Sequence, residues 1–127
     1  MSVRVSYLYR DADNYKAAES AVIAGDLTAA EIAEVWELVA RAARGAGVDP
    51  TAFSPIDLRL PPAQERLWAT TPRSAADHIY NELLSVEPSG DDPTGLLSAA
   101  NFLARLRICA RAGYNVVAAM ERLDIEG

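Results

Sequence analysis

The pattern of apolar and polar residues predicts a strand at the start of the chain. Residues 3–10 alternate between two sets, with Val3, Val5, Tyr7 and Tyr9 on one face and Arg4, Ser6, Leu8 and Arg10 on the other. Such alternation of β-branched and aromatic residues is typical of a half-buried strand. Residues 11–14 have the composition of a turn, because Asp and Asn side chains bond nearby backbone groups. The segment 15–24 then completes a hairpin.

Two amphipathic helices are predicted. Thr28 and Glu31 form a capping box that begins a helix over residues 28–44, and Gly45 is the expected stop. Its apolar stripe consists of Ile32, Val35, Trp36, Val39 and Ala43. Asp92 as N-cap and Pro93 at the first helical position predict a second helix over residues 93–112. Its buried face consists of Ala99, Phe102, Leu103, Leu106, Cys109 and Ala110. Gly113 ends it, and Asn115 caps a short last helix through Leu123.

The middle of the chain gives a weaker pattern. Residues 46–62 are rich in Gly and Pro and predict a loop, within which the alternation over 56–60 indicates a short strand or an extended packed segment. Pro62 is expected to begin a helical turn through Trp68. Residues 74–86 fit a helix, or a strand with His78, Tyr80, Glu82, Leu84 and Val86 on one face. Since an isolated hairpin is marginal in water, a strand in the later half is favoured.

These elements predict one α+β domain over residues 1–127. A small antiparallel sheet is built on the N-terminal hairpin, and the helices at about 28–44 and 93–112 pack against it. A chain of this length is near the common size of a single domain with one core.

Charge and composition narrow the function. The formal net charge is −6, which argues against wrapping nucleic acid or binding an anionic membrane. No apolar run approaches the ~20 residues that span a bilayer, and no signal peptide is recognisable at the start. The single cysteine, Cys109, rules out an internal disulfide framework. A cytoplasmic protein without a cofactor is expected.

Candidate catalytic and metal-binding residues are few. Asp11, Asp13 and Asn14 suggest a calcium loop, but Lys16 and Val22 occupy the positions where that loop needs glycine and glutamate. Turn formation is the preferred interpretation. His78 is the only histidine and a weak candidate for a general base. Cys109 lies on an apolar helix face and is expected to pack as a small hydrophobe.

Two surfaces are candidates for binding. Arg105, Arg107 and Arg111 form a basic cluster. It is interpreted first as a solvated helix face, paired with Glu31, Glu34 and Glu37 or with a neighbouring chain, and alternatively as an RNA or phosphate site. The other surface is the end of the hairpin, with Tyr9, Arg10, Asp11, Asn14 and Lys16. Tyr and Arg often supply much of the binding energy of protein interfaces. The competing interpretation is that Tyr7 and Tyr9 belong to the core.

The same segment resembles a known family. Tyr7-x-Tyr9-Arg10-Asp11-x-x-Asn14-Tyr15-Lys16 is similar to the N-terminal motif of a family of small, uncharacterised bacterial proteins. The likeness continues through Leu60-Pro61, the segment Asp77–Glu82 and the acidic stretch Val86-Glu87-Pro88. No established activity accompanies this family, so the resemblance implies a grouping and a spatial approach of the N-terminal motif to Asp77 and His78.

The leading hypothesis is a non-enzymatic accessory or regulatory protein that binds another protein or forms a homodimer. The alternative is a small enzyme or ligand-binding protein with a polar pocket between the Tyr9–Lys16 turn and His78. That alternative requires His78 within hydrogen-bond reach of Arg10, Asp11 or a tyrosine hydroxyl, beside a concave pocket. The third hypothesis is RNA or phosphate binding through the Arg105–Arg111 helix.

Overall fold

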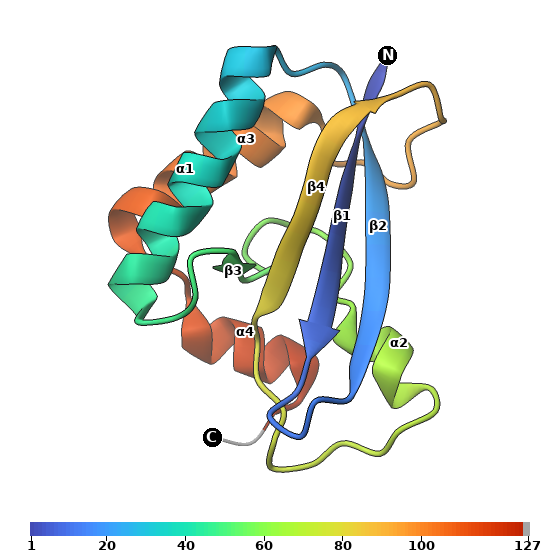
Figure 1. Cartoon of the computed structure of the whole chain (residues 1–127), viewed down its shortest axis with the longest axis vertical. Coiled ribbons are helices and arrows are strands. Elements are labelled where there is room, and N and C mark those ends of the chain that lie inside the picture. The colour runs from blue at the N-terminus through green and yellow to red at the C-terminus, as the bar shows by residue number, and fades with distance from the viewer. Residues whose placement is uncertain (126–127) are drawn as a thin grey trace.

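A four-stranded antiparallel sheet forms one layer of the protein. The computed structural model describes residues 1–125. The strands are β1 (Ser2–Arg10), β2 (Lys16–Ala24), β3 (Ala52–Phe53) and β4 (Asn81–Ser89). Their order in the sheet is β2-β1-β4-β3, so the two longest pairings both involve β1 (Figure 1). The predicted N-terminal hairpin is therefore confirmed, and its first strand lies in the middle of the sheet.

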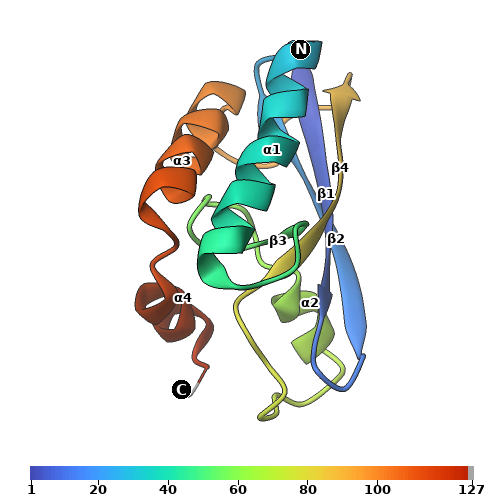
Figure 2. The ribbon, with the colours of Figure 1, turned by 60° about the vertical axis from the view of Figure 1, so that its left-hand side comes forward.

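Helices cover one face of this sheet. They are α1 (Ala29–Ala46), α2 (Gln64–Trp68), α3 (Ala99–Ala112) and α4 (Val116–Leu123). Figure 2 shows α1 and α3 on the same side of the strands, and α2 and α4 nearer the end of the hairpin. Within the described residues nothing lies over the opposite face. The predicted α+β class is confirmed, and none of the described helices has the length and apolarity that crossing a membrane requires.

The alternation in β1 explains this arrangement. Val3, Val5, Tyr7 and Tyr9 are each 0% exposed and face the helices. Tyr7 packs edge-on against Phe53 and donates a hydrogen bond to the carbonyl oxygen of Pro61 at 2.5 Å. Both tyrosines are core residues, as one of the two interpretations of this segment predicted. Aromatic side chains bury more area than aliphatic ones, so both rings contribute to the core.

The first helix follows its sequence signals closely. The Thr28 hydroxyl accepts from the Glu31 amide at 3.1 Å, and the Glu31 carboxylate accepts from the Thr28 amide at 2.9 Å. The predicted end at Gly45 is wrong by two residues, because the residue with the left-handed C-cap conformation is Gly47. Its φ of 71° is accessible to glycine without a steric penalty.

The long loop was predicted with its strand in the wrong place. The short strand is Ala52–Phe53, whereas residues 55–60 fold into a tight turn that brings both Leu58 and Leu60 into the core. Arg59, between them, has a positive φ of 62°. This turn rotates the backbone, so the alternation over 56–60 does not reflect a strand. The predicted helical turn is present as α2, which begins two residues after Pro62.

The later half of residues 74–86 forms a strand, so the favoured prediction for this segment is confirmed. β4 begins at Asn81, so His78 and Tyr80 precede it and do not share a strand face with Val86. The pairing with β1 shifts between Ser6 and Tyr7, which leaves Leu84 as an extra residue in β4. Leu84 is 53% exposed, while its neighbour Leu83 is buried. This β-bulge breaks the regular alternation that was predicted.

The predicted start of the second long helix at Pro93 is wrong. α3 begins at Ala99, and Ser98 is its N-cap, with its side chain accepting from the Asn101 amide at 3.1 Å. The residues before it run along the free edge of β2. The Thr94 amide donates to the Val22 carbonyl at 2.9 Å, and the Ala24 amide donates to Leu97 at 3.4 Å. These bonds occupy backbone groups that an uncovered edge strand would leave open.

Candidate functional site

The residues predicted to form a binding surface separate into two groups at the end of the hairpin. Tyr9 and Asp11 are buried, at 0% and 6% exposure, and present no side chain to a partner. Asn14 and Lys16 are exposed, and the Arg10 side chain retains 39% of its exposure. Tyr15, in the same turn, is 58% exposed. The accessible surface therefore consists of Arg10 and the residues at the tip of the turn.

Asp11 organises the turn. One oxygen of its carboxylate accepts hydrogen bonds from the amides of Asp13 and Tyr15, both at 2.9 Å. Asn14 adopts a φ of 67° and accepts a hydrogen bond from Arg10. Asn is among the residues that tolerate this left-handed conformation. The interpretation of the acidic segment as a turn is confirmed, because the Asp11 carboxylate bonds the local backbone.

Tyr9 links the hairpin to the segment before β4. Its hydroxyl donates to the Asp77 carboxylate at 2.6 Å and accepts from the His78 amide at 3.2 Å. Burial raises the pKa of Tyr9 above its ordinary value, and the bond to Asp77 raises it further. The ring packs edge-on against Trp68, with centroids 6.4 Å apart. Tyr9 is thus held as a neutral hydrogen-bonding group.

His78 lies beside this tyrosine and has both ring nitrogens occupied. Nε2 is 2.8 Å from the carbonyl oxygen of Arg10, and Nδ1 accepts from the Tyr80 amide at 3.1 Å. A carbonyl can only accept, so the hydrogen is assigned to Nε2. In this arrangement the ring ties two backbone segments together. Neither nitrogen is free to take up a proton from a bound molecule.

A pocket opens next to these residues. It has a volume of about 620 Å³ and is lined by Arg10, Gly47, Val48, Asp49, Ala52, His78, Tyr80, Asn81 and Glu82. The Arg10 Nε is 3.1 Å from a Glu82 carboxylate oxygen. The Asp49 carboxylate has no hydrogen bond or ion pair within residues 1–125. The approach of His78 to Arg10 and the adjacent pocket meet the spatial condition set for the ligand-binding hypothesis.

Comparisons with known proteins add no assignment. No protein-family model, no curated protein and no solved structure matches this chain.

The arginine cluster on α3 is partly neutralised. Arg107 donates to both oxygens of Glu34 on α1, at 2.8 Å each, as predicted. The other two predicted partners are used elsewhere, because Glu31 caps α1 and Glu37 pairs with Arg41. The bonds lower the pKa of Glu34 and raise the pKa of Arg107. Arg111 is exposed and Arg105 is half-buried. The pair with Glu34 reduces the positive potential that an RNA or phosphate ligand would meet.

The remaining candidate is Cys109. It is 6% exposed, and burial raises the pKa of its thiol to about 11. A thiol in this state is a poor nucleophile. The predicted packing role is confirmed by its position in the main core cluster. Among residues 1–125, no group of three or more His, Cys, Asp and Glu side chains is placed to hold a metal ion.

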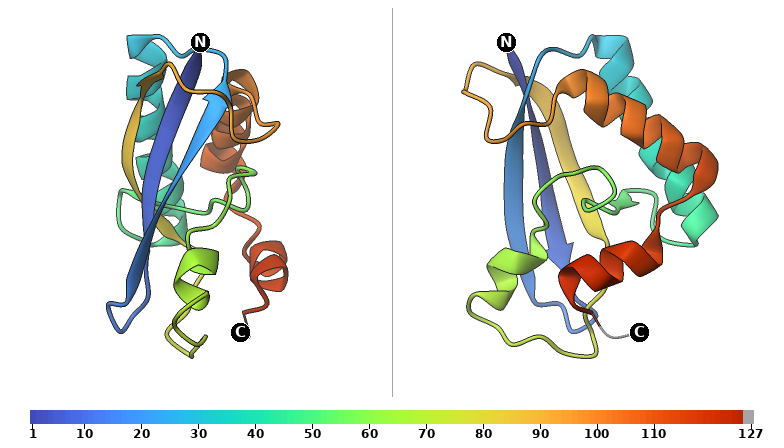
Figure 3. Two further views of the ribbon diagram at one scale, coloured as in Figure 1. Left: turned by 90° about the vertical axis from the view of Figure 1, so that its right-hand side faces the viewer. Right: turned by 180° about the vertical axis from the view of Figure 1, so that it is seen from behind.

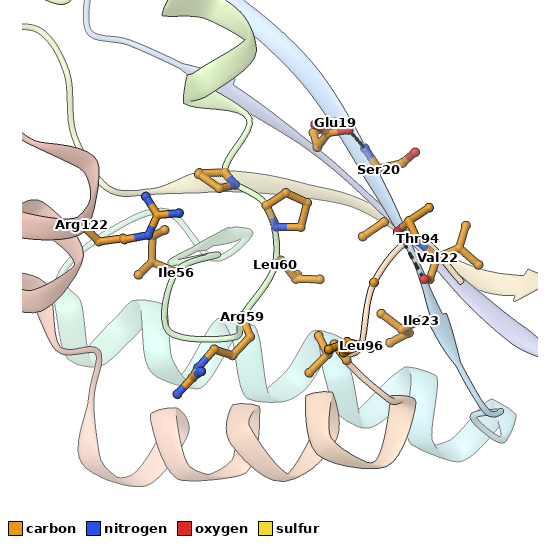
Figure 4. A pocket seen from close by; sticks show the side chains of 15 residues that line it. Glu19, Ser20, Val22, Ile23, Ile56, Arg59, Leu60, Thr94, Leu96 and Arg122 are labelled. Carbon is orange, nitrogen blue, oxygen red and sulfur yellow. Dashed lines mark hydrogen bonds between the residues drawn. The ribbon is translucent and has the colours of Figure 1, made fainter. Parts of the chain in front are cut away.

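A second pocket lies on the flank of β2 and was missed from the sequence. Its volume is about 750 Å³, and Figure 4 shows Arg59, Leu96 and Arg122 around it. Leu96 was placed in a predicted helix, and Arg59 in a predicted strand. Only the turn at 55–60 and the loop at 90–98 bring them to one place. The acidic pocket residues Asp49 and Glu82 were also missed, since they are distant in sequence and belong to no motif.

Proposed function

We propose that the protein is a non-catalytic binding protein that recognises a basic segment of another protein at the end of its hairpin. The observation that supports this most is the pocket beside Arg10. It is bordered by two carboxylates, Asp49 and Glu82, and its walls are fixed by hydrogen bonds. A preorganised polar pocket lowers the entropic cost of binding.

The charge of the pocket indicates the kind of partner. Glu82 shares its charge with Arg10, while Asp49 is exposed and without an ion-pair partner in the described chain. The whole protein carries a net charge of −6. An arginine or lysine side chain of the partner would restore charge balance there, and the long-range field would accelerate its approach.

The surface next to the pocket supplies contact area. Tyr15 is more than half exposed in the turn that Asp11 fixes, and Lys16 follows it. A rigid, exposed tyrosine is a frequent anchor of protein interfaces. Tyr9 belongs to the same motif but does not contact the partner. Its hydroxyl accepts from the His78 amide and so helps to fix the shape of the surface. We place this activity in the cytoplasm, as composition predicts.

A peptide titration tests the proposal. The probe is a fluorescent peptide of alternating Arg and Gly, measured by anisotropy at ~0.1 M salt, where exposed charges are partly screened. We expect Glu82→Gln and Asp49→Asn each to weaken binding about tenfold, because a charge-assisted hydrogen bond is lost. Glu87→Gln, at the other end of β4, makes the same charge change away from the pocket and is the matched control.

Two results would overturn this assignment. One is equal binding by Glu82→Gln, Asp49→Asn and the Glu87→Gln control. This result would mean that the peptide responds to the net charge of the protein and not to the two carboxylates of the pocket. The other is an absence of peptide binding together with a dimeric mass in solution that Tyr15→Ala converts to a monomer. In that case the hairpin end would serve homodimerisation, the rival form of the hypothesis.

A further inference from the structure

The pocket on the flank of β2 has the size and composition of a small-molecule site. It is bounded by β2, the turn at 55–62, the loop at 94–97 and α4. Figure 3 shows, from behind, the segment after β3 crossing the inner side of the sheet above α4. A volume of about 750 Å³ is within the common range for ligand pockets, ~300–1,000 Å³. This pocket shares no lining residue with the one beside His78.

Most of the residues that line the pocket are apolar. Its apolar lining residues are Ala21, Val22, Ile23, Ile56, Leu60, Pro61, Pro62, Leu96 and Leu97. Leu96 is fully exposed to solvent, although the loop that carries it is fixed. Thr94 and Leu97, on either side, are bonded to the backbone of β2. The backbone therefore presents Leu96 to water beside an apolar cavity, where a bound apolar group would cover it.

The rim carries positive charge. Arg59 and Arg122 both line the pocket and are exposed. Arg122 has one distant ion pair, 3.7 Å from Glu65, and Arg59 has no hydrogen-bond or ion-pair partner from its side chain within residues 1–125. Among residues 1–125, Glu19 is the only carboxylate in the lining, and it is paired with Arg66 at 3.1 Å. Within the described residues, Arg59 is thus an unpaired cation at the rim of the pocket, on a protein that is acidic overall.

The backbone conformation at Arg59 is one that an arginine adopts only at a steric cost. The Arg59 amide donates to Ile56 at 3.2 Å and the Leu60 amide donates to Pro55 at 2.9 Å, which closes a turn around the positive φ of 62°. This is a conformation in which glycine has no steric penalty and arginine does. The fold alone would favour glycine here. The Arg59 guanidinium, which has no partner within residues 1–125, is exposed at the rim and available to a ligand.

We propose that this pocket binds an amphipathic organic anion, an aliphatic carboxylate of medium chain length. The chain lies against Leu60, Leu96 and the apolar wall of β2, and the carboxylate is paired by Arg59 with Arg122 beside it. A singly charged head group matches the one unpaired cation better than a phosphate dianion does. The guanidinium fork suits a carboxylate through two parallel hydrogen bonds.

Calorimetric titration with decanoate, below its micellar concentration, tests the charge requirement. We expect decanoate to bind at least about tenfold more tightly than decanol, which has the same chain length but no charge, since a charge-assisted pair is worth that factor. Decyltrimethylammonium is expected not to bind. From octanoate to decanoate the affinity should rise about fourfold per methylene. Equal binding of decanoate and decanol, or no binding of decanoate, would overturn the proposal.

Variants then locate the ligand. Arg59→Gln and Arg59→Gly should each weaken decanoate binding about tenfold, and Leu96→Ser should weaken it by a similar factor through lost apolar contact. Arg44→Gln, an exposed arginine on α1 outside the pocket, is the matched control. Arg59→Gly is expected to keep or raise the melting temperature, so its loss of binding cannot be attributed to unfolding. Unchanged decanoate binding in both Arg59 variants would place the ligand elsewhere.

Discussion

The end of the hairpin and the flank of β2 use polar residues in opposite ways. At the hairpin end, Tyr9, Asp11 and His78 have their hydrogen bonds completed by the protein's own backbone and side chains. On the flank of β2, Arg59 has no such partner in the described chain, and Leu96 is fully exposed. The first region looked most functional in sequence, yet its inner residues build the fold. The second lacked any motif, yet its side chains are left available to a ligand.

The two regions differ in what their polar side chains do. At the hairpin end they fix the shape of the surface, whereas on the flank of β2 they remain available to bind a ligand. A completed hydrogen-bond network fixes a surface but leaves few groups to react. That is why the hairpin end fits recognition of a partner, through the exposed Tyr15 and the carboxylates next to Arg10. It is also why His78, with both nitrogens bonded to backbone, does not have the free nitrogen of a general base.

Replacing Tyr9 is expected to have the largest effect on stability. Tyr9→Ala removes a fully buried ring and leaves the Asp77 carboxylate without its 2.6 Å donor. Large-to-small changes of this kind cost about 3–5 kcal/mol. Tyr15→Ala, six residues later in an exposed position, should change stability by no more than about 0.5 kcal/mol. Urea unfolding of both variants measures the difference. Similar losses in the two would contradict the division of the motif into core and surface residues.

His78→Phe should have the next largest effect. Phenylalanine keeps a ring in place but leaves the Arg10 carbonyl and the Tyr80 amide without their partners. An unsatisfied buried polar group costs about 1–3 kcal/mol, and since His78 is partly exposed we expect a total of about 2 kcal/mol. Denaturant unfolding gives this value. A variant as stable as the parent would mean that water replaces both bonds and that the histidine has no structural role.

The sequence was sufficient for the elements that depend on local signals. The β1 alternation, the Thr28–Glu31 capping box and the Asn115 cap each depend on residues a few positions apart, and each is present. The errors occur where distant contacts decide. The residues before α3 are held by the bonds of Thr94 and Leu97 to β2, and no local pattern indicates an edge strand that lies 72 residues earlier.

The candidate site could be predicted only in part for the same reason. The approach of the motif to Asp77 and His78 was anticipated, but which side chains would be buried was not. Alternation placed Tyr9 on the core face and left the partners of its hydroxyl undetermined. In the structure the hydroxyl is bonded to both the Asp77 carboxylate and the His78 amide. Glu82 reaches Arg10 because β4 pairs with β1, and Asp49 lines the same pocket because β3 pairs with β4. The predicted strand over 56–60 misplaced the second of these pairings.

The smallest expected effect concerns two of the three non-glycine residues with positive φ within residues 1–125, one from each of the two regions. Asn14 has a φ of 67° and Arg59 a φ of 62°. Asn14 tolerates the conformation and its side chain accepts from Arg10, so Asn14→Gly should be neutral or destabilise the protein by about 0.5 kcal/mol. Arg59 has the steric cost without a bond that offsets it, so Arg59→Gly should stabilise the protein by about 0.5–1 kcal/mol. Thermal unfolding of both variants in parallel detects this difference in sign.

If Arg59→Gly destabilises the protein instead, its guanidinium contributes to the fold, and the flank of β2 resembles the hairpin end after all. A gain in stability, by contrast, would mean that this arginine is retained at a cost to the fold, as residues kept for binding commonly are.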